Sequence, residues 1–366
     1  MSRKHFSWLL LVTLLVAAVV ILLPGKTGRE SSMENDVFLP ALAAQVNDID
    51  WLRLTVAGDV PVATFRREGS NWVVEEASSY RADWDQLKGF LAGLSRARVV
   101  EVKTDNPDYY SRLGVEDVSS AEAAGVMVEF AENSGIPAVI IGNDAKARDG
   151  QYARLRDSAA SVLLDLRVNL PRLQNGWLDK KIIDIPDAEV VEFSIGHPGD
   201  DGIRALKVSA DDENFKLQNI PDGRQIKSEW SVNAPANSLA ALDLEAVAPA
   251  VNFNWDNSVL FRVVTADGLT VDVDLIAVGE TESGTGAGET ESSEPQEAEH
   301  WLRLRAGIYT TAIEGVAGTS DDDAVTAARA EEINRRVDGW AYRIPGYKHD
   351  PMTRKMEDLL KAEEQQ

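Results

Sequence analysis

The sequence predicts an α+β protein: two tandem copies of a mixed, mostly antiparallel sheet-plus-helix module behind an N-terminal transmembrane helix. Three observations lead to this prediction. They are an apolar run near the N-terminus, short alternating strands separated by turn residues, and segments that recur in the same order. With 366 residues, of which 44% are hydrophobic, the chain is long enough to bury more than one core of ordinary size.

Segment 1–30 is predicted to be a membrane anchor. An uncharged apolar run extends from Phe6 to Leu23, after Arg3 and Lys4. This run is at the short end of a membrane span, is longer than a usual signal-peptide core, and is followed by no A-x-A-like cleavage site. The basic residues favour an N-terminus inside the cell, which would place the bulk of a bacterial chain in the periplasm. The alternative is a cleaved signal peptide.

The first module is predicted at 45–186, after a polar linker at 31–44. It begins with a strand in which Leu52 and Leu54 alternate with polar residues. The stretch "ATFRREGSNWVVEE" then predicts a hairpin, because Gly69 and the two residues after it supply a turn.

The helix of this module is predicted at 83–95, where the Asp83 side chain can cap the first turn. An apolar stripe along one side predicts that the helix packs on a sheet. The stripe consists of Leu87, Phe90, Leu91 and Leu94. A return strand, "ARVVEVKTDN", and a hairpin, "GVMVEFAENSGIPAVIIG", follow it.

A second module is predicted at 187–345, because segments of the first module recur there. "NDIDWLRL" matches "AEVVEFSI", "GSNWVVEEA" matches "DENFKLQNI", and "QYARLRD" matches "HWLRLRA". "NGWLDKK", from Asn175, is matched to "DGWAYRI", from Asp338, and the first helix to a predicted helix at 238–248. Because the matches keep one order along the chain, they indicate a duplication.

The end of the chain adds an insertion and a tail. Residues 279–299 are rich in Glu, Ser, Thr and Gly, and we predict that they are disordered because they cannot bury enough apolar surface. "SDDDAVTAARAEEINRRVDGW" then predicts an Asp-capped helix. The tail at 346–366 is predicted to be a short amphipathic helix. Its apolar side consists of Met352, Met356, Leu359 and Leu360.

Composition excludes several functions. The formal net charge is −23, with 60 acidic against 37 basic residues, so the surface repels nucleic-acid phosphates and no nucleic-acid partner is expected. There is no cysteine, which excludes disulfides, thiolate metal sites and a cysteine nucleophile.

No catalytic, cofactor-binding or metal-ligating residues are predicted, and no cofactor. "PGKTG" lacks the upstream glycine of a phosphate-binding loop, and no serine lies in a G-x-S-x-G turn. The histidines lie far apart and lack the spacing of a metal site. They are His5, His197, His300 and His349.

Two groups of side chains raise the question of a binding role. Tryptophan rings can stack on sugars. Most of the five candidate tryptophans, however, lie at repeat-equivalent strand positions or beside turn glycines, which favours a place in the core. They are Trp72, Trp177, Trp230, Trp301 and Trp340. Arginines alternate with leucines in the repeated "ARLR" and "WLRLR" segments. This alternation favours a place for the arginines on the solvent face of a strand. The alternative is that they form a basic stripe that binds an acidic partner. They are Arg154, Arg156, Arg303 and Arg305.

Several of these segments together resemble the DUF4340 family of exported bacterial proteins of unknown function. They are the apolar N-terminus, "FLPALAAQVNDIDWLRL", "GSNWVVEEASSYRADWDQLKGFLAGL", "SRLGVED" and "VIIGNDAKARDGQYARL". The resemblance spans most of residues 36–345. It implies an association with ABC-type transport components similar to gliding-motility auxiliary proteins, and it carries over no catalytic residue.

We therefore expect a non-enzymatic, single-pass protein of the bacterial inner membrane, whose periplasmic modules serve as an accessory to an ABC-type export or envelope system. The alternative is a ligand- or polysaccharide-binding module that uses a cleft between the two repeats. A third possibility is an unrecognised enzyme. Exposed, clustered tryptophan rings would favour the second function, and a buried histidine–carboxylate pair in a cleft would favour the third.

Overall fold

The protein is described here by a computed structural model, in which the described residues are 35–146, 148–200, 202–209, 212–279, 298–309 and 320–362. They divide into two compact units, one formed by 35–76 with 81–177 and the other by 77–80 with 178–362. Both units are α+β with mostly antiparallel sheets. The predicted anchor lies outside the described residues, among which no helix is long and apolar enough to cross a membrane.

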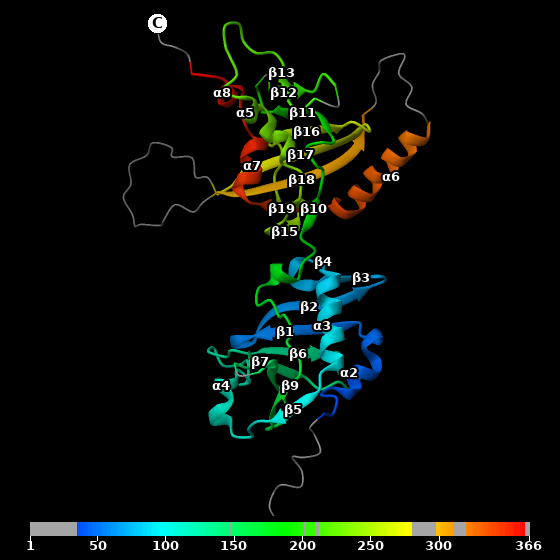
Figure 1. Ribbon diagram of the computed structural model, residues 1–366, viewed down its shortest axis with the longest axis vertical. Helices are drawn as coiled ribbons and strands as arrows, with labels where there is room; N and C mark the ends of the chain where they lie inside the picture. The colour runs from blue at the N-terminus through cyan, green and yellow to red at the C-terminus, as the bar shows by residue number, and fades with distance from the viewer. Residues whose placement is uncertain are drawn as a thin grey trace, which may run out of the picture. The chain divides into compact units, whose positions relative to one another are not determined.

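The first unit is built on one 9-stranded sheet (Figure 1). Its strands are β1 (Trp51–Val56), β2 (Val60–Glu68), β3 (Asn71–Val74), β4 (Tyr80–Arg81), β5 (Val99–Val102), β6 (Val126–Phe130), β7 (Val139–Asp144), β8 (Gln151–Leu155) and β9 (Ser161–Leu164). They lie in the order β4-β3-β2-β1-β6-β7-β8-β9-β5, and neighbours from β3 to β5 run antiparallel.

The hairpin predicted around Gly69 is confirmed. Glu68 pairs with Asn71 across the turn, so Gly69 and Ser70 form a two-residue loop between β2 and β3. Gly69 has φ +62°, a left-handed conformation that favours glycine because it carries no Cβ.

The helices of the first unit are α2 (Pro40–Gln45), α3 (Trp84–Arg96) and α4 (Tyr110–Leu113). The capping of α3 is confirmed, because the Asp83 side chain accepts a hydrogen bond from the Gln86 backbone N–H at 3.0 Å. All four residues of the predicted apolar stripe are buried, and Figure 1 shows α3 lying across the sheet. In α2, of which all but Gln45 falls within the predicted linker at 31–44, Leu42 is fully buried, so folded structure begins before residue 45.

The second unit is built on an 8-stranded sheet. Its strands are β11 (Val190–Gly196), β12 (Ile203–Leu206), β13 (Lys216–Leu217), β15 (Ala246–Pro249), β16 (Val259–Thr265), β17 (Leu269–Val278), β18 (Glu299–Ile308) and β19 (Trp340–Ile344). They lie in the order β13-β12-β11-β16-β17-β18-β19-β15, and every neighbouring pair runs antiparallel. Aligning β1 with β11 makes this order correspond, strand by strand, to β3-β2-β1-β6-β7-β8-β9-β5 of the first unit.

The predicted helix at 238–248 is wrong. This region follows helix α5 (Glu229–Asn233) and the 3-10 segment η8 (Ala234–Asn237), and it forms turns and strands instead. Leu239 is buried, as Leu87 is in α3, but it lies in a turn. Two causes act together. Pro235 and the left-handed Ala241 interrupt a helix, and strand β14 (Leu242–Asp243) pairs with β10 (Lys181–Ile183), a ladder that outweighs the helix propensity of alanine and leucine.

The match between "NGWLDKK" and "DGWAYRI" is also wrong. The second segment is β19, which takes the place that β9 holds in the first sheet, whereas Asn175 and the residues after it lie beyond β9. The matching failed because the long helix α6 (Ser320–Val337) separates β18 from β19, while β8 and β9 are joined by a short turn.

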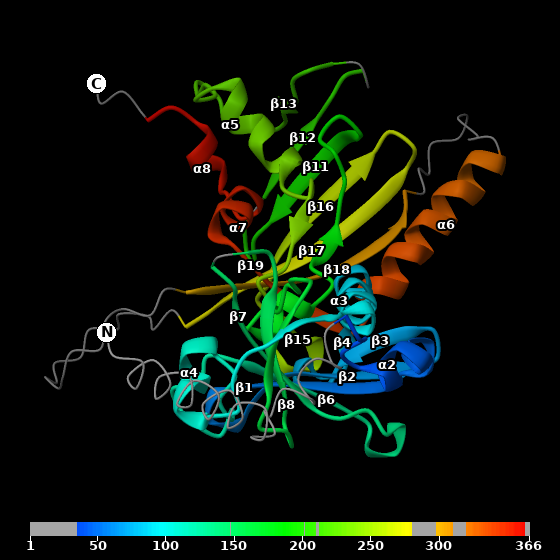
Figure 2. The same cartoon turned by 60° about the horizontal axis from the view of Figure 1, so that its bottom comes forward.

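The remaining helices of the second unit lie on different sides of its sheet. Figures 1 and 2 both show α6 alongside β18, and they show α5 and α7 (Gly346–Met352) together, away from α6. The predicted tail helix is split into α7 and α8 (Met356–Leu359). Its apolar side is largely buried, because Met352 and Leu359 are fully buried and Leu360 forms a β-bridge with Ile226.

Residues 280–297 of the predicted insertion lie outside the described residues. The helix predicted after it is α6, and the aspartates at 321–323 that were expected to cap it lie inside its first turn. The insertion was predicted to end at residue 299. Glu299 instead pairs with Val278 in the β17–β18 ladder, so the insertion ends before this residue.

Candidate functional site

The second unit has a pocket of about 330 Å³ between α5, η8 and α7. Two large rings stand exposed at this pocket: Trp230 on α5 is 75% exposed and Tyr347 on α7 is 73% exposed. Polar groups of Asp187, Asn233 and Lys348 also line it. Exposed aromatic faces beside hydrogen-bonding groups are the usual chemistry of a site for a small polar ligand.

Hydrogen bonds fix the two helices that form this pocket. The Ser228 side chain caps α5 by accepting from the Ser231 backbone N–H at 3.1 Å. On the other side, Nζ of Lys348 donates to the backbone carbonyl of Ala240 at 2.6 Å and ties α7 to the turn after η8. Burial lowers the pKa of the Lys348 ammonium, against the attraction of Asp184 and Asp243.

A second hollow of about 320 Å³ adjoins this pocket, because Asp187 and Asn233 line both. Lys207 lies over the Phe215 ring there, with its Nζ 5.1 Å from the ring centre. Asn233 is held in place by the backbone N–H of Phe215, which donates to its Oδ1 at 3.0 Å. The two hollows are therefore neighbours that share the polar side chains of Asp187 and Asn233.

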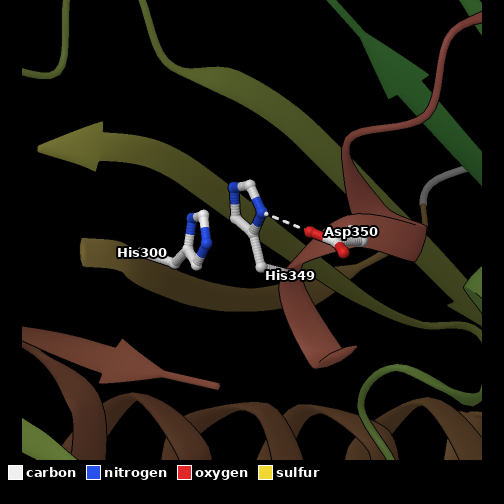
Figure 3. Close-up of side chains that lie close together, drawn as sticks. All are labelled: His300, His349 and Asp350. Carbon is white, nitrogen blue, oxygen red and sulfur yellow. Dashed lines mark hydrogen bonds and ion pairs between the residues drawn. The ribbon is translucent and has the colours of Figure 1, made fainter. Parts of the chain in front are cut away.

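A second candidate site brings two histidines together (Figure 3). The rings of His300 on β18 and His349 on α7 are stacked with centroids 3.9 Å apart and planes 20° apart. Nδ1 of His349 lies 3.3 Å from a carboxylate oxygen of Asp350. Nδ1 of His300 is buried and has no hydrogen-bond partner among the described residues.

The prediction of no metal-ligating cluster missed this arrangement because His300 and His349 are separated in the sequence by α6 and β19. The antiparallel pairing of β18 with β19 places His300 opposite Ile344. Helix α7 begins two residues later, at Gly346, so its first turn carries His349 back toward His300. The cluster could have been predicted only from the correct pairing of β18 with β19. Of the other two histidines, His197 has Nε2 3.2 Å from the Arg354 carbonyl, and His5 lies outside the described residues.

One face of the second sheet is charged and hollowed, with a volume of about 750 Å³. Cross-strand ion pairs follow each other over it: Arg262 with Asp272 at 2.5 Å, and Arg303 with Asp274 at 2.8 Å. The opposite face of β17 is apolar, as its alternating burial pattern requires. Arg303 and Arg305 therefore occupy the solvent face of a strand, as predicted.

The corresponding face of the first sheet is covered, and here the prediction for Arg154 is wrong. Arg154 is only 4% exposed. Its guanidinium donates to the Val115 carbonyl at 2.8 Å and to Asp117 at 2.7 Å, and it lies over the Tyr110 ring. The segment between β5 and β6 therefore covers this face, and it closes an apolar cluster. The buried members of that cluster are Tyr110, Val115, Val118, Met127 and Ile140.

The predicted place of the tryptophans in the core is confirmed for three of the five. Trp72, Trp177 and Trp301 are buried, and Trp340 is half-buried. For Trp230 the prediction is wrong, because this residue is exposed beside the pocket on α5.

The fold is α+β, with one large, mostly antiparallel sheet in each unit, and the pocket, the histidine pair and the charged face described above all belong to the second unit. A family model described as a domain of unknown function, DUF4340, matches residues 72–257, from β3 of the first unit to the residue before Ser258 and β16 of the second. The chain belongs to the DUF4340 family. Searches of curated proteins and of solved structures find no match.

Proposed function

We propose that the protein is a non-enzymatic accessory protein, anchored in the bacterial inner membrane by Phe6–Leu23, whose two tandem copies of one module bind a partner in the periplasm. The partner is a membrane component of an ABC-type export or envelope system. The apolar run supports the anchor, and the corresponding strand orders support the duplication. The association with transport is an inference from the resemblance to the family.

The observation that carries the binding role is the difference between the two sheets. The segment between β5 and β6 covers the face of the first sheet on which Arg154 lies. In the second unit the shorter segment 250–258, between β15 and β16, covers the corresponding face only in part: the Trp255 ring lies over Arg303, and a hollow remains over the ion pairs. The position of Ile140 in the first sheet, opposite Arg154, is held in the second by Asp274, opposite Arg303. An open face with fixed, alternating charges is suited to a protein partner that presents complementary charges.

Reversing one ion pair on this face tests the proposal. In the double variant Arg262→Asp with Asp272→Arg the pair is kept, but the charge pattern that a partner meets is inverted. The matched control is Arg66→Glu with Glu75→Arg, which reverses an exposed pair at 3.1 Å in the first unit. Each form is purified from native membranes in gentle detergent, and the proteins that co-purify are identified.

We expect the wild type and the control to retain a transport component that the Arg262/Asp272 variant loses, with all three forms melting at similar temperatures. If the Arg262/Asp272 variant retained the same partner, this would contradict a role for the charged face in binding it. Co-purification of no transport component with any form would contradict the accessory function.

The second candidate is a ligand- or polysaccharide-binding module, and the pocket that carries Trp230 and Tyr347 favours it. This pocket lies within the second unit. Sugar rings stack on exposed aromatic faces, so Trp230→Ala or Tyr347→Ala is expected to abolish binding of soluble envelope oligosaccharides. Trp84→Ala is the control, because this ring is also exposed, at 48%, but lies in the first unit. Absence of saturable oligosaccharide binding to the wild type would eliminate this candidate.

A further inference from the structure

The stacked pair of His300 and His349 has a chemical feature that the fold does not explain. Buried polar atoms normally have a hydrogen-bond partner, yet Nδ1 of His300 has none among the described residues. The equivalent position in the first sheet is Gln151, whose amide nitrogen and oxygen both have hydrogen-bond partners. It donates to the Gly142 carbonyl and accepts from the Val168 backbone N–H. Because a glutamine with hydrogen-bond partners occupies this strand position in the first sheet, the strand itself does not require a histidine here.

The side chains that lie near the His300 imidazole are of the types that bind metal ions. One ligand atom from each of His300, His349 and Asp350 can be chosen so that all three lie within 4.8 Å of one another. The ligand atoms of a tetrahedral zinc site lie about 3.3 Å apart, given metal–ligand bonds of about 2.0–2.2 Å. Binding an ion would therefore require the ligand atoms to move closer together by about 1.5 Å at most.

We propose that His300, His349 and Asp350 bind a divalent transition-metal ion of the zinc type. Two imidazoles and one carboxylate are ligands that Zn²⁺ accepts, and water would fill the fourth position. Imidazole also selects against Mg²⁺ and Ca²⁺, which prefer sites made of oxygen ligands. An ion bound through Nδ1 of His300 would give this nitrogen the partner that it lacks.

Such an ion has a structural consequence that extends beyond the cluster. It would bridge β18 to α7, and α7 also carries Tyr347 and Lys348, which line the pocket facing α5. His349 is 11% exposed and Asp350 is 74% exposed, so the ion can enter from solvent beside Asp350. Metal binding would therefore fix one wall of that pocket.

The test uses the full-length protein in detergent, stripped with EDTA and titrated with Co²⁺ and then with Zn²⁺. We expect one equivalent of Co²⁺ to give the visible bands of a tetrahedral site, and Zn²⁺ to displace it and raise the melting temperature. His300→Ala and His349→Ala are expected to weaken binding by more than about 100-fold, because loss of even an outer partner costs 10–100-fold. Asp350→Asn is expected to weaken it less than the histidine variants do, but by at least about 10-fold, because the amide loses the negative charge and keeps an oxygen that can bind the ion.

His197→Ala is the control, because it removes a histidine elsewhere in the unit and should leave the titration unchanged. X-ray absorption of the Zn²⁺-loaded wild type counts the imidazole ligands without any variant, so the proposal stays testable if a variant fails to fold. Two imidazoles would support it. Oxygen ligands alone, unchanged binding in either histidine variant, or no saturable binding by the wild type would overturn it.

Discussion

Arg154 and Arg303 hold matching positions on β8 and β18 but have opposite environments. Arg154 is buried under the segment that precedes β6, where it satisfies the carbonyls of Val115, Arg156 and Ser158. Arg303 is half-exposed in an ion pair with Asp274. The difference comes from the segment that covers each sheet and from the residue opposite the arginine, which is Ile140 in the first sheet and Asp274 in the second.

We expect Arg154→Ala to lower the free energy of unfolding by about 2–3 kcal/mol, because it leaves buried carbonyls without a donor and removes a side chain packed on Tyr110. Arg156→Ala is the control, since its pair with Glu129 is exposed and such pairs contribute about 0–1 kcal/mol. Urea unfolding of both variants measures the difference. Equal losses would show that the buried guanidinium has no special role.

Glu299 gives the second unit a pH dependence. Hydrogen bonds from the Trp301 indole and from Arg343 lower the pKa of this carboxyl below its ordinary value of 4.5. The ionised form therefore contributes stability that is present above pH 4.5 and is lost as the pH falls through the folded-state pKa.

We expect Glu299→Gln to melt below the wild type at pH values well above 4.5, and the gap to narrow as the pH falls below that value. Melting curves of both proteins over an acidic pH series measure this gap. A gap that stays constant with pH would mean that the charge of Glu299 does not contribute.

At the scale of elements, α3 can be compared with the segment of the second unit that was predicted to form the matching helix at 238–248. The two segments show where the local sequence pattern decides the structure and where it does not. The α3 sequence has a capping Asp83 and one continuous apolar stripe, and it forms a helix. In the second unit Pro235 lies in the first turn of η8, and Ala241 adopts a left-handed φ of +44°. Both interrupt a helix, so this part of the second unit contains only the short α5 and η8.

The buried stripe of α3 predicts the effect of a charge. Leu91 is 4% exposed, so Leu91→Asp buries a carboxylate without a partner, and we expect it to lower the free energy of unfolding by several kcal/mol, about 3 or more. Lys88→Asp, at an exposed position of the same helix, should change it by less than about 0.5 kcal/mol. Thermal melting compares the two. Similar melting temperatures would mean that the stripe does not face the core.

At the scale of the whole molecule, the two sheets share one strand order but differ in their additions. The first has a cover between β5 and β6, and the second has α6 between β18 and β19. Asn334 of α6 hydrogen-bonds both backbone groups of Ala306 on β18, at 2.8 and 2.9 Å. The helix therefore satisfies a strand edge that β19 leaves unpaired, because the β18–β19 ladder extends only from His300 to Leu302.

We expect the acidic insertion to be dispensable. Because Val278 pairs with Glu299, residues 279–298 can be replaced by Asn-Gly, the preferred two-residue turn between antiparallel strands. This variant should keep the melting temperature and the partner of the wild type. A variant without segment 1–30 should stay folded and still bind in solution, but bind less in cells, because tethering raises the local concentration of a membrane partner.

Pull-downs with the three forms separate these roles. If partner capture were lost on removing only the insertion, the acidic segment would be the recognition element. The intact mass of the full-length protein from the membrane fraction tests the anchor itself. A mature chain that starts after residue 17 or later would show that the apolar run is cleaved.

The sequence by itself determined the features that depend on neighbouring residues. Alternation predicted β1, a glycine turn predicted the β2–β3 hairpin, and a cap with an apolar stripe predicted α3, because each of these is set by contacts within a few positions. The recurrence of "ARLR" and "WLRLR" likewise identified β8 and β18 as matching strands.

Only the tertiary structure decided the features that depend on residues far apart in the chain. The pairing of β10 with β14 removed a predicted helix, the cover over Tyr110 buried Arg154, and the pairing of β18 with β19 brought His300 to His349. The same holds for Trp230, whose exposure beside Tyr347 follows from the docking of α7 near α5. Local pattern carries no information about such partners, because the free energy that selects them comes from packing between distant segments.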